Sequence, residues 1–185
     1  MTKTAVIFHS GYGHAQRVAQ FVADGAQAQL IAIDADGNIS EADWATLDAA
    51  DAIVFGSPTY MGMVSWQFKK FADASSKRWF SGAWKDKVAG GFTISGSPSG
   101  DKLSTIQYFI TLAMQHGMVW VGQPAMNDGN INRIGSNSGV MAQVGPTSPA
   151  ADIPQGDLDT AKAYGERVRL LAQRMGRLIA EALSP

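Results

Sequence analysis

The sequence predicts an α/β fold in which helices cover both faces of a parallel sheet. Five short runs of apolar residues recur along the chain, and segments with helical spacing of apolar residues separate them. Strands that helices cover on both faces are apolar throughout, whereas half-exposed strands alternate between apolar and polar residues. Right-handed crossovers between such strands make the sheet doubly wound.

Each predicted strand is a short apolar run that is bounded by turn-forming residues. The five runs lie at residues 4–9, 30–33, 52–55, 87–93 and 118–121. This pattern is compatible with a Rossmann order and with a flavodoxin order of the strands. The small number of strands, and a length of 185 residues that suits a single domain over residues 1–185, favour the flavodoxin-like order 2-1-3-4-5.

Helices are predicted between the strands because apolar residues recur there at spacings of three and four. The residues expected on their buried faces include Val18 and Val22, Phe68 and Phe71, Leu103 and Ile106, and a stripe from about Leu158 to Leu178. Trp66, Trp84 and Trp120 are expected in the core. The segment 122–156 has no such period and is rich in Gly, Pro, Asn and Ser, so we interpret it as a lid, completed by a neighbouring subunit.

Composition and charge exclude several classes of function. The formal net charge is −1, which gives no electrostatic footprint for nucleic acid or an anionic membrane. Cysteine is absent, so disulfides and thiol catalysis are excluded. The three histidines are scattered without metal-ligand spacing, and we expect no metal. The apolar N-terminal run is too short for a signal or membrane-spanning segment, so a cytoplasmic protein is expected.

The loop after the first strand is the first candidate site, because ligands of a doubly wound sheet bind outside the carboxyl ends of its strands. It reads HSGYGHA over residues 9–15. The following helix N-terminus offers free N–H groups to a phosphate, Gly11 and Gly13 permit close approach, and Ser10 adds a hydroxyl donor. The loop matches neither a Walker pattern nor GxGxxG, so a monophosphate such as that of FMN fits best. A simple strand-to-helix turn is the alternative.

The loops after the third and fourth strands supply the other predicted walls. Residues 56–62 place Pro58, Thr59, Tyr60 and Met61 beside one another, which combines apolar surface with hydrogen-bonding groups. Residues 93–101 are rich in Ser and Gly and offer backbone donors. A planar ring system fits between such walls, although each loop taken alone is also compatible with an ordinary polar turn.

Four motifs follow one another along the chain. They are HSGYGHA at 9–15, DAIVFGSPT at 51–59, RWFSGAW at 78–84 and QHGMV at 115–119. In this order they resemble the WrbA-type NAD(P)H:quinone oxidoreductases of the flavodoxin-like superfamily, over residues 2–176. The resemblance implies an FMN flavoprotein that passes two electrons from NADH or NADPH to quinones as a homodimer or homotetramer. The flavin performs the chemistry in such proteins, so no catalytic side chain is expected.

The resemblance also implies a role for each motif position. The FMN phosphate would be held by Ser10, Gly11, Tyr12, Gly13, His14 and Ala15. The isoalloxazine ring would lie along Pro58, Thr59, Tyr60 and Met61, and its edge and the ribityl chain along Ile94, Ser95, Gly96, Ser97, Pro98 and Ser99. Gln115 or His116 would also reach the flavin. Tyr12 would contact the nicotinamide, and Trp79 of another subunit would face the flavin and contact the quinone.

One departure from the family keeps two other functions open. Tyr60 and Met61 stand where the family usually has Arg-Phe, which removes a positive charge near the flavin edge. A one-electron carrier resembling a true flavodoxin is the first alternative, although such carriers are typically strongly acidic and this chain is nearly neutral. A non-catalytic FMN-binding or regulatory protein is the second.

Overall fold

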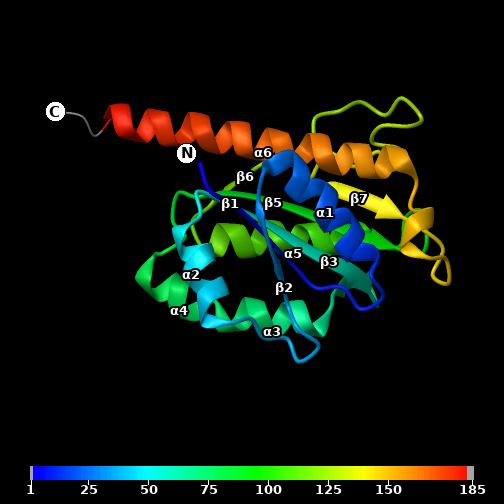
Figure 1. Cartoon of the computed structure of the whole chain (residues 1–185), viewed down its shortest axis with the longest axis horizontal. Coiled ribbons are helices and arrows are strands. Elements are labelled where there is room, and N and C mark those ends of the chain that lie inside the picture. The colour runs from blue at the N-terminus through cyan, green and yellow to red at the C-terminus, as the bar shows by residue number, and fades with distance from the viewer. Residues whose placement is uncertain (1, 183–185) are drawn as a thin grey trace.

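A central parallel sheet dominates the structure, a computed structural model that describes residues 2–182 (Figure 1). The strands are β1 (Thr4–Phe8), β2 (Gln29–Ala32), β3 (Ala52–Tyr60), β4 (Met63–Val64), β5 (Val88–Ser95), β6 (Val119–Trp120) and β7 (Val140–Gln143). The helices are α1 (His14–Ala26), α2 (Glu41–Ala49), α3 (Trp66–Ala74), α4 (Ser76–Ser81), α5 (Lys102–Gln115) and α6 (Gln155–Ala182), with a 3-10 turn, η1 (Ala150–Asp152). The parallel order β2-β1-β3-β5-β6 confirms the predicted flavodoxin-like arrangement.

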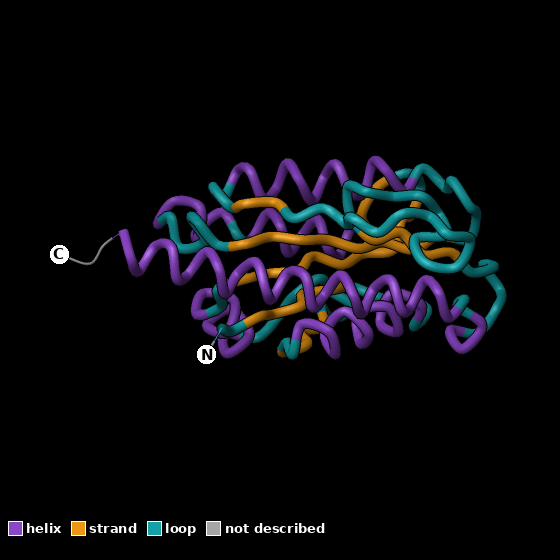
Figure 2. The backbone as a smooth tube through the Cα atoms, turned by 90° about the horizontal axis from the view of Figure 1, so that it is seen from above, coloured by secondary structure: helices purple, strands orange, loops and turns teal. Residues whose placement is uncertain are grey.

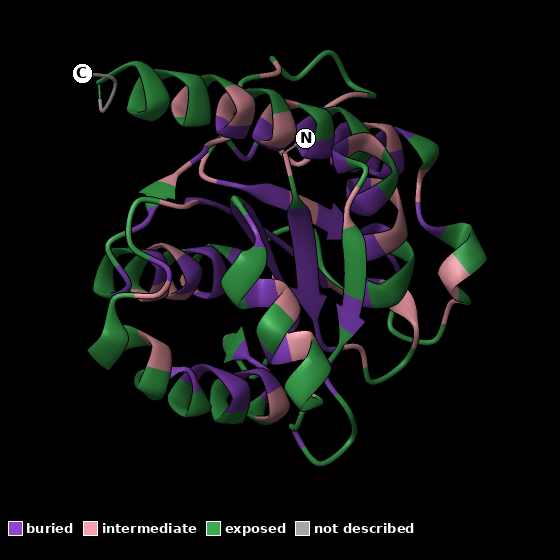
Figure 3. Cartoon of the chain, turned by 60° about the vertical axis from the view of Figure 1, so that its left-hand side comes forward, coloured by how far each residue is buried: buried purple, intermediate pink, exposed green. Residues whose placement is uncertain are grey.

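The sheet lies between two layers of helices (Figure 2). In β1, Val6 and Phe8 belong to the core shared with α1 and α6, whereas Ala5 and Ile7 belong to the core shared with α2, α3 and α5. All four side chains are buried. Figure 3 shows that the central strands are buried and that the outer faces of the helices are exposed. The central strands β1, β3 and β5 are therefore apolar runs because both of their faces are core, whereas β2, at the sheet edge, exposes three of its four residues.

Two glycines let α1 and α6 pack closely. A Cβ at Gly25 would lie 1.8 Å from the carbonyl oxygen of Lys162, and a Cβ at Gly165 would lie 2.0 Å from that of Val22. A side chain at either position would force the two helices apart. The far end of α6 extends past the sheet (Figure 1), which is why Leu178 is 61% exposed although the helical stripe predicted it to be buried.

Two other residues that were expected on buried faces are exposed. Trp66 is the first residue of α3 and is 61% exposed, and Leu103, in the first turn of α5, is 49% exposed. The buried face of α5 runs through Lys102 and Thr105, one residue away from the predicted apolar stripe. Hydrophobic spacing could not reveal this rotation because both residues are polar. The remaining predicted core tryptophans are Trp84, which is buried, and Trp120, which is half-buried.

The sheet edge beside β5 is interrupted. β6 pairs with the start of β5 at residues 88–89, and β7 pairs with its end at residues 92–95, so residues 122–139 leave the edge and return to it. The segment 122–156 is therefore not the irregular lid that was expected, because it contains β7, η1 and the start of α6. The excursion is fastened to α6 by the ion pair between Arg133 Nη2 and Asp157 Oδ2, 2.8 Å apart, and by the hydrogen bond from the Asn132 N–H to Thr160 Oγ1.

Candidate functional site

The candidate site is a cleft at the carboxyl ends of β1, β3 and β5. Its cavity volume is about 240 Å³, and all three predicted loops contribute to it. The lining residues are Ser10, Gly11, Tyr12, His14, Ala15, Pro58, Thr59, Tyr60, Ile94, Ser95, Gly96, Val144 and Pro146. The predicted cofactor-binding residues that lie outside this lining are Gly13, Met61, Ser97, Pro98, Ser99, Gln115 and His116, and Trp79, predicted to act on another subunit, lies outside it as well.

The loop after β1 forms a cradle at the start of α1. Gly13 is the N-cap of this helix with φ = 84°, and its position gives the helix no side-chain cap. The first N–H groups of α1 therefore have no acceptor inside the helix and none from a capping side chain. The Ser10 Oγ is hidden from solvent and has no hydrogen-bond partner within residues 2–182. Free amides, the helix dipole and an unpaired hydroxyl together suit a phosphate.

His14 connects this cradle to a wall that sequence reasoning missed. Its Nε2 lies 2.7 Å from the carbonyl oxygen of Ser148, so Nε2 carries the proton and donates it. This bond holds the loop after β7 beside the cradle, and Val144 and Pro146 of that loop line the cleft. Both were missed because β7 lies inside the segment that was interpreted as a lid. The signal that could have found them is the apolar run VMAQV at residues 140–144.

Two tyrosines form the aromatic side of the cleft. The ring centroids of Tyr12 and Tyr60 are 6.2 Å apart in an edge-to-face contact. Tyr12 is 78% exposed, which leaves its ring free to contact a second ligand at the mouth. Burial, together with the neighbouring Tyr12, raises the pKa of Tyr60, so this phenol stays neutral at physiological pH. Met61 is fully exposed at the turn between β3 and β4 and does not reach the cleft.

The wall that β3 contributes is part of the sheet rather than a loop. β3 continues beyond its predicted end at residue 55 as far as Tyr60, and its last residues pair with β4. The Thr59 Oγ1 lies 2.8 Å from the hydroxyl oxygens of both Thr93 and Thr105, which ties the ends of β3, β5 and α5 together. A wall fixed in this way holds a flat ligand without having to be ordered on binding.

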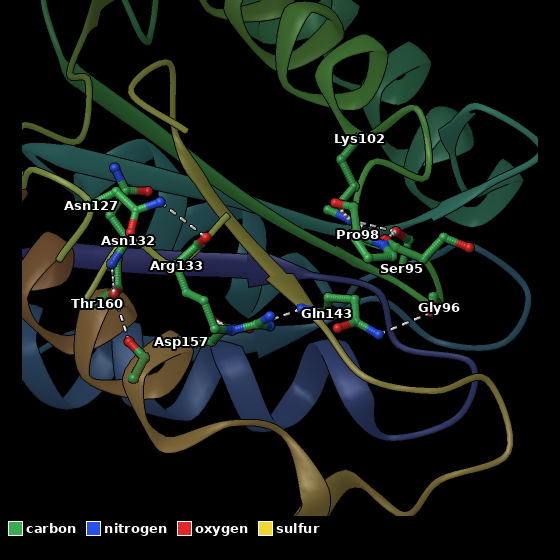
Figure 4. Close-up of polar contacts among 12 residues, drawn as sticks. Ser95, Gly96, Pro98, Lys102, Asn127, Asn132, Arg133, Gln143, Asp157 and Thr160 are labelled. Carbon is green, nitrogen blue, oxygen red and sulfur yellow. Dashed lines mark hydrogen bonds and ion pairs between the residues drawn. The ribbon is translucent and has the colours of Figure 1, made fainter. Parts of the chain in front are cut away.

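The loop after β5 is divided between the cleft and a buried lysine. Ser95 and Gly96 line the cleft. The carbonyl oxygens of Ser97 and Pro98 instead accept hydrogen bonds from Lys102 Nζ, at 2.7 and 3.0 Å (Figure 4). Ser99 lines a separate hollow beside the start of α5. Ser95 and Gly96 of the predicted loop therefore face the cleft, whereas Ser97 and Pro98 are bound by Lys102.

A second group of predicted residues lies at the other end of the sheet. Trp79, Gln115 and His116 line a separate hollow between α3, α4 and α5. His116 Nε2 lies 2.9 Å from Ser75 Oγ, and burial lowers the pKa of His116. Trp79 is 47% exposed, so its ring is accessible at the surface. These residues lie near the amino ends of β5 and β6, so none of them reaches the cleft of its own chain.

The residues that line the cleft fit FMN. The cradle offers amides and the unpaired Ser10 hydroxyl to a phosphate. Pro58, Tyr60 and Ile94 provide apolar surface for a planar ring, and Ser95 and Gly96 bring the backbone at the end of β5 to the cleft. None of the lining side chains is acidic, so no carboxylate repels the phosphate.

The chain resembles known flavoproteins along most of its length. The model of the NADPH-dependent FMN reductase family matches residues 40–132. Flavodoxin FldP of Pseudomonas aeruginosa (strain UCBPP-PA14) is 49% identical over 182 residues, covering 95% of this chain and 99% of that protein. An NAD(P)H dehydrogenase (quinone) of Syntrophobacter fumaroxidans is 31% identical over 203 residues, covering 95% of this chain and 99% of that protein.

A solved structure extends these similarities to three dimensions. It is described as a flavodoxin, WrbA-like protein from Agrobacterium tumefaciens, and it is 53% identical with a TM-score of 0.81, covering 95% of this chain and 99% of that one. Together the matches confirm the resemblance that the four motifs predicted, and they confirm FMN and NAD(P)H as the cofactors of the family. No helix within residues 2–182 is both long and apolar enough to cross a membrane.

Proposed function

This chain belongs to the NADPH-dependent FMN reductase family of flavodoxin-like proteins, and we propose that it transfers two electrons from NADH or NADPH to quinone-type acceptors. The main support is the cleft, in which a phosphate cradle meets walls for a planar ring while the exposed ring of Tyr12 stands at the mouth. FMN bound there would supply the hydride and electron chemistry, and the protein supplies binding, orientation and electrostatics.

The residues of the cleft divide into those that bind, those that orient and those that meet the substrate. Ser10 and the N–H groups at the start of α1 bind the phosphate. Pro58 and Tyr60 hold the ring from β3, and Ser95 with Gly96 closes its edge from β5. Tyr12 contacts the nicotinamide at the mouth. Donor and acceptor use this one mouth in turn, so the steady-state kinetics are ping-pong.

The relative from Syntrophobacter fumaroxidans supports the quinone proposal through its name, NAD(P)H dehydrogenase (quinone). The relative from Pseudomonas aeruginosa, named a flavodoxin, favours a second candidate function, one-electron transfer between protein partners. A net charge of −1 argues against that second function, because docking by a small carrier draws on a strong charge of one sign. The third candidate, a non-catalytic FMN-binding protein, is favoured by Tyr60, which stands where the family usually has an Arg.

The first experiment is an absorption spectrum of the purified protein, followed by oxidation of NADH and NADPH in the presence of benzoquinone. The proposal expects an FMN spectrum, one quinone reduced for each nicotinamide oxidised, and parallel lines in a two-substrate initial-rate plot. Full FMN occupancy without nicotinamide oxidation contradicts the proposal. In that case a stable one-electron state in a reductive titration identifies the carrier, and its absence leaves the non-catalytic protein.

The position of Trp79 supports a site that is completed by another subunit of a cytoplasmic homodimer or homotetramer of single-domain chains. Trp79 and Phe80 are exposed aromatic residues with ring centroids 4.8 Å apart, and they share one end of the molecule with Gln115 and His116. A neighbour that places this end over the open cleft would exclude water from it. Aromatic anchors of this kind are typical of interfaces.

Trp79→Ala tests the shared site, and Phe80→Ala, which removes a more exposed neighbouring ring, is the control for general loss of apolar surface. We expect Trp79→Ala to keep the fold and lower quinone turnover more than Phe80→Ala does. Analytical ultracentrifugation that finds a fully active monomer would contradict the shared site while leaving the proposed reaction intact.

A further inference from the structure

Lys102 is buried to an extent that is unusual for a lysine. It begins α5, is 1% exposed, and donates three hydrogen bonds through its Nζ (Figure 4). The acceptors are Ser95 Oγ at 2.7 Å, the Ser97 carbonyl oxygen at 2.7 Å and the Pro98 carbonyl oxygen at 3.0 Å. An ammonium group has three donors, so each has an acceptor here. Lysine is rarely buried fully unless such partners hold it.

The three acceptors belong to the loop that walls the cleft. Ser95 lines the cleft, and its hydroxyl oxygen accepts a hydrogen bond from Lys102. A second side chain holds the same loop, because Gln143 Nε2 donates to the Gly96 carbonyl oxygen at 3.1 Å. The segment Ser95–Pro98 is therefore held by one charged side chain, Lys102, and one neutral side chain, Gln143, and neither of them lines the cleft.

The positive charge of Lys102 is not cancelled by a contacting carboxylate. Asp157 of α6, the acidic group whose charge acts on Lys102, is already paired with Arg133 through Nε–Oδ1 and Nη2–Oδ2 contacts of 3.1 and 2.8 Å. Burial lowers the pKa of Lys102 to about 8, with Asp157 raising it and Arg133 lowering it. Asp101, the preceding residue, is exposed. Lys102 is thus a cation at neutral pH whose direct partners are all neutral.

We propose that Lys102 is a positioning residue that fixes the Ser95–Pro98 wall and places an uncompensated positive charge behind it, which favours the reduced form of the bound flavin. This inference rests on the proposed function in that FMN must occupy the cleft. Two electrons and one proton convert the neutral oxidised ring into an anion, so a cation nearby stabilises the reduced form more than the oxidised one. The hydrogen bonds of Lys102 contribute to the affinity for FMN, and its charge contributes to the midpoint potential, so the two contributions can be measured separately.

Four variants separate these contributions. Lys102→Met removes the charge and the three hydrogen bonds, and Lys102→Gln removes the charge but keeps a donor. Gln143→Leu removes the neutral tether of the same loop without changing any charge. Lys87→Met is the matched control at the other end of the sheet, because Lys87 is also partly buried and donates to the carbonyl oxygens of Leu47 and Asp48.

The readouts are the FMN dissociation constant, from quenching of flavin fluorescence, and the two-electron midpoint potential, from anaerobic equilibration with a reference dye. Circular dichroism of each apoprotein confirms that it folds. We expect Lys102→Met to weaken oxidised FMN about tenfold through loss of its buried hydrogen bonds. We expect both Lys102 variants to weaken the binding of reduced FMN about tenfold more than the binding of oxidised FMN, which corresponds to a midpoint potential about 30 mV more negative. Gln143→Leu should weaken binding at an unchanged potential, and Lys87→Met should change neither quantity.

The alternative outcomes are distinct. A wild-type potential in Lys102→Gln overturns the role of the charge, and wild-type FMN affinity in Lys102→Met overturns the role of the hydrogen bonds. Equal effects of Lys87→Met and Lys102→Met mean general destabilisation and also overturn the inference. If Lys102→Met does not fold, Lys102→Gln still tests the role of the charge and Gln143→Leu still tests the role of the hydrogen bonds that hold the loop. A wild-type protein that binds no FMN overturns the proposed function as well, whereas normal FMN binding with silent Lys102 variants overturns this inference alone.

Discussion

The hydroxyl of Tyr164 on α6 bridges β5 and the chain after β6, at the point where this chain leaves the edge of the sheet. The ladder between β5 and the β6 segment runs from Val119 N–H to the Lys87 carbonyl and from Val121 N–H to the Ala89 carbonyl, at 2.9 and 2.8 Å. The next rung of a parallel ladder would join the Gly91 N–H to the Val121 carbonyl. The Tyr164 hydroxyl stands between them instead, accepting from Gly91 at 3.1 Å and donating to Val121 at 2.6 Å.

Tyr164→Phe removes this bridge and leaves both backbone groups without a partner. Tyr164 is 1% exposed, so water does not replace the hydroxyl without opening the core. A buried donor or acceptor that loses its partner costs about 1–3 kcal/mol, so the loss of both should cost about 2–6 kcal/mol. With a urea m-value of about 2 kcal/mol/M, the midpoint of urea unfolding should fall by about 1–3 M.

Urea unfolding followed by circular dichroism measures this change. Tyr108→Phe is the matched control, because Tyr108 lies half-buried on α5 and its hydroxyl makes no hydrogen bond within the described residues. We expect the control to stay within about 0.5 kcal/mol of the wild type. If Tyr164→Phe also stays within that range, the inserted hydroxyl does not stabilise the broken edge and the reasoning is wrong.

Three further predictions test the cradle, the helix packing and the buried lysine. Ser10→Ala should weaken FMN about tenfold without changing riboflavin affinity in calorimetry, because the unpaired Ser10 hydroxyl is assigned to the phosphate; equal losses for both ligands would contradict this. Gly25→Ala should lower stability by about 1–3 kcal/mol in urea unfolding, whereas Gly176→Ala on α6, which has open space around it, should be neutral or stabilising. The pKa of Lys102 is lowered to about 8 in the folded protein, so the unfolded chain binds more protons above that pH. The stability of the wild type relative to Lys102→Met should therefore rise between about pH 8 and pH 10.5, and a flat difference would contradict the buried charge.

The sequence predicted the parts of the site that lie directly after strong strands. Ser10, Pro58 and Ile94 sit where apolar runs end, and a parallel sheet necessarily gathers its strand ends at one edge. Lys102 could not be found in this way, because a lysine among the apolar residues of α5 is indistinguishable from a solvent-facing one until its acceptors are known. Its partners come from a loop whose shape depends on the lysine itself.

Val144 and Pro146 were missed for a topological reason. A continuous edge strand along β5 would pass the cleft once and then enter the last helix. Here the chain leaves the edge after Val121 and re-enters as β7, in a register that sets Gln143 beside Ser95 and so delivers Val144 to the cleft. Whether a four-residue strand forms there is decided by contacts distant in sequence, chiefly the Asp157 carboxylate, which accepts from both Arg133 and the Gln143 N–H.

The excursion therefore contributes to the site by returning to the sheet rather than by covering the cleft. Asp157 is 1% exposed and joins the excursion, β7 and α6 at one point. β7 in turn supplies the Gln143 tether to Gly96 and leads into the loop whose Ser148 carbonyl holds His14 in the cradle. Loss of this junction would consequently loosen two walls of the cleft together, the phosphate side and the β5 side, although none of its charged groups lines the cleft itself.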